Sequence, residues 1–116
     1  MPSTLVEPKY RACIDACAEC EQACENCNYT CCEGSAEMVD CGHQCIDCAA
    51  ICRLCVELLS RGSAVALKVC ELCAAVCEAC AEECAKYDME SCQRCADACR
   101  RCVAECRALV SAMANA

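Results

Sequence analysis

Cysteine recurs along this chain at spacings that alternate between three and four residues. The segment CQRCADACRRCVAEC, residues 92–106, holds five cysteines in this pattern. Spacings of three and four place side chains on one face of an α-helix, as at the a and d positions of a heptad. Four such stripes occur: Cys13, Cys17, Cys20, Cys24, Cys27 and Cys31; Cys41, Cys45, Cys48, Cys52 and Cys55; Cys70, Cys73, Cys77, Cys80 and Cys84; and Cys92, Cys95, Cys99, Cys102 and Cys106. Cys32 is additional, and at about 100° per residue it should leave the stripe that ends at Cys31.

The stripes predict an all-α protein of four helices, at about residues 6–32, 36–60, 64–86 and 89–113. A unit of the form C-x-x-C-A-x-x-C repeats as CIDCAAIC, CELCAAVC and CQRCADAC, and alanine, the best helix former, fills many flanking positions. Short links between long helices favour antiparallel neighbours. We therefore expect residues 1–116 to form one domain, an up-down-up-down antiparallel four-helix bundle with a cysteine-lined core.

Composition agrees with a core built from sulfur. The chain has 116 residues, of which 22 are cysteine, and it has no Phe and no Trp. The formal net charge of −8 leaves no basic stripe for a nucleic acid and disfavours binding to an anionic membrane surface.

The N-terminal sequence bears on whether the thiols are reduced or joined in disulfide bonds. MPSTLVEPKYRAC has no basic segment followed by an apolar segment and a cleavage site, and no stretch is long and apolar enough to span a membrane. We therefore expect a cytoplasmic protein with reduced thiols, since disulfides are rare in that compartment. Cysteines three or four apart on one helix are also poorly placed for disulfide bonds.

All-sulfur sites suit Cu(I), Zn(II) and iron–sulfur clusters. A four-thiolate zinc site carries a charge of about −2, and several of them in one apolar core would be costly. Each Cu⁺ replaces one thiol proton and leaves the charge unchanged, which favours Cu(I) at about one ion per cysteine. Iron–sulfur clusters need four cysteines at one place, and the ferredoxin-type run C-x₂-C-x₂-C-x₃-C-P is absent from the sequence. No constellation of a nucleophile with a base is present, so we expect no enzymatic activity. A zinc or mixed-metal thiolate reservoir and a thiol redox or copper-sensing protein remain as alternatives.

Antiparallel threading should make the two ends of the core different. One end should be a hydrophobic plug made by Leu5, Val6, Val56, Leu58, Leu59, Val65, Leu67, Leu109, Val110 and Met113. The other end should carry Cys31, Cys41, Cys84 and Cys92, with Cys32, Met38, Met89 and His43 nearby as candidate mouth ligands. His43 lies about 160–200° around the helix from Cys41 and Cys45, so it should point outward.

The repeated units, above all CELCAAVCEACAEECAKYDMESCQRCADACRRCVAECR, resemble the bacterial copper storage proteins, and the missing signal peptide matches their cytosolic branch. The resemblance runs from about Cys13 to Cys106. It implies a four-helix bundle whose inward cysteines hold many Cu(I) ions, assembled as a homotetramer. Where relatives often have a mouth histidine, this chain has Met89. We expect copper to arrive from a cytosolic copper chaperone or a small-thiol copper complex.

Overall fold

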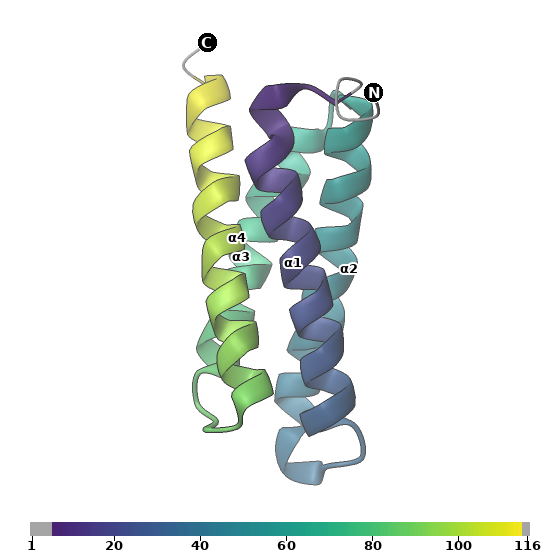
Figure 1. The fold of residues 1–116 in the computed structure, drawn as a ribbon, viewed down its shortest axis with the longest axis vertical. Coiled ribbons are helices and arrows are strands. Elements are labelled where there is room, and N and C mark those ends of the chain that lie inside the picture. Colours follow the sequence, from purple (N-terminus) through teal and green to yellow (C-terminus); the bar gives the residue numbers. More distant parts are fainter. Residues whose placement is uncertain (1–5, 115–116) are drawn as a thin grey trace.

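The computed structural model describes residues 6–114 and shows the predicted all-α, antiparallel four-helix bundle (Figure 1). A 3₁₀ turn, Pro8–Tyr10, leads into α1, Arg11–Cys27, which continues as a π-helical turn, Asn28–Cys32. A second 3₁₀ turn, Ala36–Met38, precedes α2, Val39–Arg61. The remaining helices are α3, Ala66–Cys84, and α4, Glu90–Ala114. In the described part of the chain, no helix has the length and apolar character that crossing a bilayer requires.

Each helix packs against two others, α1 and α3 both lying between α2 and α4. The links from α1 to α2 and from α3 to α4 lie at one end of the bundle (Figure 1). The link from α2 to α3 lies at the opposite end, with the start of α1 and the end of α4. The four cysteine stripes therefore face one another along a common axis.

Gly62 ends α2 in the left-handed region, with φ 69°. Its N–H donates to the carbonyl of Leu59 at 3.1 Å, and the N–H of Ser63 donates to the carbonyl of Leu58 at 2.9 Å. This pair of bonds is a Schellman motif, which favours glycine because a side chain strains this backbone conformation. The motif turns the chain sharply enough for α3 to run back beside α2.

Apolar side chains seal the bundle at the end with the α2–α3 link, which we call the closed end. Leu58, Leu59 and Leu109 are buried there, Leu59 with only 1% of its surface exposed. Val6, Val56, Leu67, Val110 and Met113 are partly buried against the core. Val65 lies in the link before the first residue of α3 and is 48% exposed. The prediction that it belongs to the plug is therefore wrong. Leu5 lies outside the described residues.

Replacing Leu59 with alanine is expected to lower the free energy of unfolding of the metal-free protein by about 2–5 kcal/mol, since the change opens a cavity in a sealed apolar cluster. Leu72→Ala is the matched control: Leu72 is 55% exposed, and its loss should cost about 0.5 kcal/mol or less. Urea denaturation of both reduced variants, followed by circular dichroism, measures the difference. Equal losses in the two variants would contradict the role given to Leu59.

Candidate metal centre

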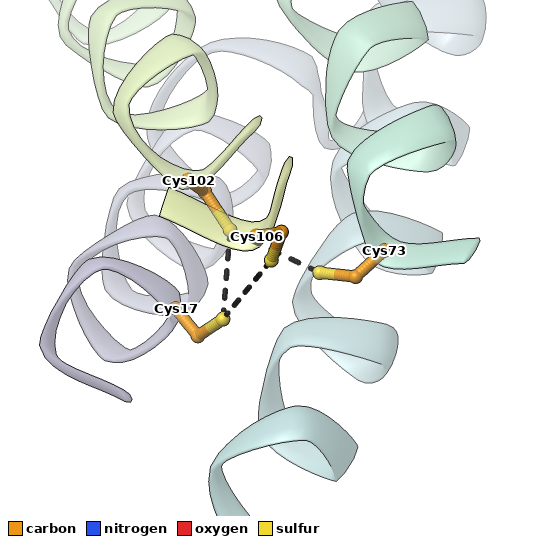
Figure 2. Close-up of side chains that lie close together, drawn as sticks. All are labelled: Cys17, Cys73, Cys102 and Cys106. Carbon is orange, nitrogen blue, oxygen red and sulfur yellow. Dashed lines mark hydrogen bonds between the residues drawn. The ribbon is translucent and has the colours of Figure 1, made fainter. Parts of the chain in front are cut away.

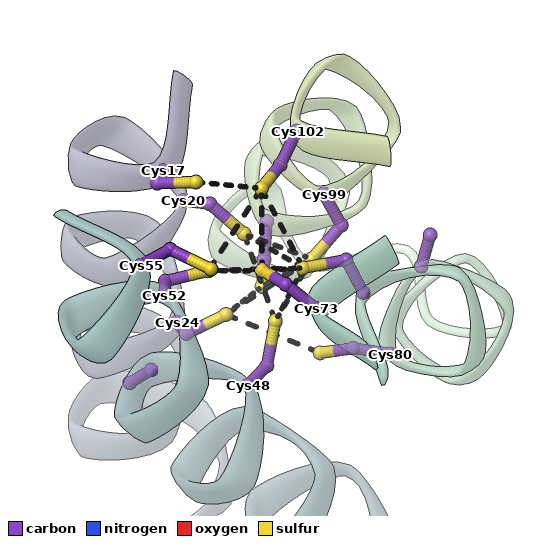
Figure 3. Packing of buried hydrophobic residues seen from close by; sticks show 14 of the residues in the cluster. Cys17, Cys20, Cys24, Cys48, Cys52, Cys55, Cys73, Cys80, Cys99 and Cys102 are labelled. Carbon is purple, nitrogen blue, oxygen red and sulfur yellow. Dashed lines mark hydrogen bonds between the residues drawn. The ribbon is translucent and has the colours of Figure 1, made fainter. Parts of the chain in front are cut away.

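The bundle axis is lined by thiols from all four helices (Figure 3). All 22 cysteines are free; 21 of them are buried and only Cys31 is partly exposed. Among residues 6–114, no polar or charged side chain is buried. The interior therefore offers sulfur as its only side-chain ligand and holds no cation that could balance thiolate charge.

The thiols form a continuous network of short contacts along the axis. Sγ–Sγ distances between neighbours range from 3.3 Å, between Cys48 and Cys77, to 4.0 Å, between Cys24 and Cys80. These distances are far longer than the S–S bond of about 2.05 Å in a disulfide. They match the separation of two sulfurs bound to one metal ion: sulfurs 2.3 Å from a tetrahedral zinc lie about 3.8 Å apart.

The network contains groups of four thiols whose sulfur atoms all lie within 4.8 Å of one another. In one group, drawn in Figure 2, Cys17 is 3.6 Å from Cys102 and 3.9 Å from Cys106, and Cys73 is 3.9 Å from Cys102. Five of these quartets are Cys17, Cys73, Cys102 and Cys106; Cys20, Cys52, Cys77 and Cys102; Cys20, Cys24, Cys48 and Cys99; Cys24, Cys45, Cys80 and Cys95; and Cys27, Cys41, Cys45 and Cys84. Each quartet takes thiols from at least three helices.

Neighbouring quartets share members, which bears on the choice of metal. Cys20, Cys24, Cys45 and Cys102 each belong to two quartets. Separate tetrahedral zinc sites would compete for these thiols, and each complete four-thiolate site would add about −2 of uncompensated charge. Cu(I) with bridging thiolates avoids both problems, because one ion per thiolate keeps the lining neutral.

Burial governs the protonation of the thiols at the end that carries the α1–α2 link. Desolvation raises the pKa of Cys32 to about 12 and raises the pKa values of Cys41 and Cys92 as well. The neighbouring Cys27 and Cys31 thiols further raise the pKa of Cys92. These groups are neutral thiols at pH 7, so a metal ion must displace their protons to bind.

Two thiols of one quartet have pKa values that are lowered and not raised. Hydrogen bonding with Cys24 lowers the pKa of Cys80 to about 7 and that of Cys95 to about 6. A thiolate at either position accepts hydrogen bonds from neutral neighbours, which favours the charged form. Hydrogen bonds within this quartet therefore favour the thiolate form at Cys80 and Cys95.

The structure reverses the predicted places of Cys31 and Cys32. Cys32 is buried, with 4% of its surface exposed, and Cys31 is the partly exposed one. The reason is the π-helical turn Asn28–Cys32, in which the N–H of Glu33 donates to the carbonyl of Asn28 at 2.8 Å. This bond spans five residues instead of four. The fifth residue after Cys27 therefore takes the inward place that the fourth would take in an α-helix.

A glycine on the neighbouring helix makes room for this turn. A Cβ at Gly42 would lie 2.9 Å from Asn28 Oδ1 and 3.1 Å from Cys32 Cβ, closer than such atoms normally approach. Sequence reasoning missed this role, because no local pattern links Gly42 to residues 28–32.

The candidate mouth ligands lie in three different environments. His43 is exposed, as predicted, and lines a surface pocket of about 270 Å³ together with Cys32 and Gly42. Met38 is buried, with 4% exposed, whereas Met89 is 41% exposed. We call this end, with Cys31, Cys41, Cys84 and Cys92, the open end: Cys41 is 3.5 Å from Cys84, and Cys27 is 3.6 Å from Cys92.

Comparison with known proteins places this geometry among metal-binding bundles. Residues 6–111 match the family described as copper storage protein. A Cu(I)-bound copper storage protein, BsCsp3, is 39% identical over 88% of this chain and 98% of its own, with a TM-score of 0.84. The metal-free copper storage protein 3 from Bacillus subtilis is 39% identical over 87% of this chain and 98% of its own, with a TM-score of 0.82. A cytosolic copper storage protein from Streptomyces lividans holding five coppers is 35% identical over 89% of this chain and 92% of its own, with a TM-score of 0.81. A search of curated proteins finds no match.

Proposed function

This chain belongs to the copper storage protein family, and we infer from that premise that its sulfur-lined core stores and buffers many Cu(I) ions. The observation that carries the inference is the continuous network of buried free thiols with shared quartets. Such a lining holds many soft cations at once and keeps its charge constant as they replace protons.

All 22 cysteines are proposed as ligands, the 21 buried ones along the axis and Cys31 at the open end. Storage rather than catalysis is supported by the uniform lining, since a catalytic metal site keeps an open position and a base nearby.

A cytoplasmic location is supported by the cytosolic protein from Streptomyces lividans. Copper would arrive by ligand exchange from a chaperone or a small-thiol complex. A homotetramer is supported by exposed apolar side chains on α2, namely Ile46 and Leu54.

The test is an anaerobic titration of the reduced protein with Cu(I), then desalting and metal analysis. We expect about 20 Cu(I) per chain to be retained against a competing chelator, because soft thiolates are the ligands. A zinc titration run in parallel should plateau at a few ions. A variant with Cys20, Cys24, Cys48 and Cys99 changed to alanine should hold roughly four fewer Cu(I), at one ion per thiolate. A wild-type plateau at a few Cu(I) would reject storage.

Met89 and Met38 are proposed to assist uptake at the open end, because thioethers are soft ligands for Cu(I). The double variant Met38→Leu, Met89→Leu keeps the side chains apolar and of similar size. It is expected to take up Cu(I) more slowly than the wild type and to reach the same final content. Stopped-flow absorbance of the copper–thiolate bands measures the rate, and unchanged uptake would argue against the methionines.

A further inference from the structure

Cys31 and Cys32 are adjacent in sequence, but one thiol is partly exposed and the other is buried in the bundle. Cys32 is buried against the core, and Cys31 is the one thiol of the 22 that is not buried. The predicted α-helical register would place them the other way round, with Cys31 on the stripe of Cys24 and Cys27. The extra residue in the turn Asn28–Cys32 is therefore what holds Cys31 at the surface.

Cys31 also packs against the thiol-lined core. Its neighbour Thr30 hydrogen-bonds Ser91 at 3.0 Å, which holds the turn against the start of α4. The Thr30–Ser91 bond places the turn that carries Cys31 against the segment that carries Cys92. Cys92 is 3.6 Å from Cys27, and Cys27 is 4.0 Å from Cys41. Neighbouring sulfurs thus lead from the segment beside this turn to the buried quartet of Cys27, Cys41, Cys45 and Cys84.

We propose that Cys31 is the thiol that receives Cu(I) from its donor, and that the π-helical turn packed on Gly42 keeps it accessible. This inference rests on the proposed storage function. In the transfer step a Cys31 Sγ–Cu bond forms and the donor's S–Cu bond breaks. The thiol proton of Cys31 passes to the departing donor thiolate, and copper remains Cu(I) throughout. In the next exchange a Cys92 Sγ–Cu bond forms, the Cys31 Sγ–Cu bond breaks and the thiol proton of Cys92 passes to Cys31, which is then free for the next ion; the same exchange moves copper on to Cys27.

The first experiment compares two variants that each lose one thiol, one at each end of the bundle. Cys31→Ser removes the proposed receiving thiol, and Cys13→Ser measures what the loss of a ligand at the closed end does to the rate. The probe is the Cu(I)–glutathione complex, mixed with reduced protein under anaerobic conditions. Initial uptake by Cys31→Ser should be slower by about tenfold or more, since the buried thiols become accessible only when the open end unfolds locally. Uptake by Cys31→Ser as fast as by Cys13→Ser would overturn the proposal.

The second experiment tests the turn and needs no copper. Brief treatment of the metal-free protein with iodoacetamide should label Cys31 before any other cysteine. In Gly42→Ala the added Cβ crowds Cys32, so labelling should move from Cys31 to Cys32, with the helical content unchanged. Labelling that stays on Cys31 in this variant would overturn the role of the turn. A wild-type protein that holds only a few Cu(I) would reject the storage function and leave the labelling result standing.

Discussion

Metal-free, reduced protein is expected to lose its helical fold between about pH 9 and 10.5, because the thiols whose pKa values burial raises resist ionisation that the unfolded chain accepts. Burial raises the pKa of Cys32 to about 12 and also raises the pKa values of Cys41 and Cys92. In the unfolded chain each thiol titrates near about 8.5. Above that pH the unfolded state binds fewer protons than the folded state, so stability falls as pH rises.

The size of the effect follows from the number of thiols. Each thiol with a raised pKa costs about 1.4 kcal/mol of stability for every pH unit above its unfolded value. A domain of this size is stable by roughly 5–15 kcal/mol in total. A handful of such thiols therefore removes the whole stability within one to two pH units, and their contribution is fully present below about pH 8.

Circular dichroism during an anaerobic alkaline titration measures this loss. The matched control is the Cu(I)-loaded protein, whose sulfurs hold copper instead of protons and should keep the helical signal over the same range. Reversal on return to pH 7 would show that no disulfides formed. A metal-free protein that keeps its helices to pH 11 would contradict the assigned cause.

Loading with Cu(I) is expected to raise the midpoint of thermal unfolding at pH 7 by roughly 20 °C or more, since a ligand that binds only the folded state stabilises it by mass action. The thiol quartets assemble from at least three helices, and unfolding separates them. Each retained ion therefore adds to the free energy of unfolding. The effect should exceed that of any single side-chain substitution in the protein.

Thermal melts at increasing Cu(I) content, followed by circular dichroism, test this expectation. The midpoint should rise with every addition until the thiols are filled. A protein incubated with the same amount of Zn(II) and desalted is the control, and its midpoint should rise less. Midpoints of the loaded and metal-free proteins that differ by less than about 5 °C would show that copper binds without holding the helices together.

Much of the fold was predictable because the core residues are chemically distinct. Cysteine at spacings of three and four marks the buried face of each helix directly, and short links then set the antiparallel order. The contact of Cys41 with Cys84 at 3.5 Å confirms that these two predicted neighbours lie at the same end of the bundle. The outward direction of His43 is confirmed for the same reason, since α2 keeps a regular α-helical period there.

The places of Cys31 and Cys32 were not predictable, because a constant α-helical rotation was assumed up to the end of the first helix. The π-helical turn depends on a contact with Gly42, which belongs to another helix. The different burial of Met38 and Met89 escaped prediction as well. Both methionines directly precede helices, where the period of the stripe no longer determines direction.

The sealed end of the bundle sets the order in which a store of this kind empties. Leu58, Leu59 and Leu109 are buried beyond Cys13 and Cys106, so we expect ions at that end to leave past the sulfurs nearer the open end. Cu(I) taken up last would be discharged first, and the deepest ions would have the longest residence times. Isotopically labelled copper added at the end of loading should therefore dominate the first fraction released to a chelator.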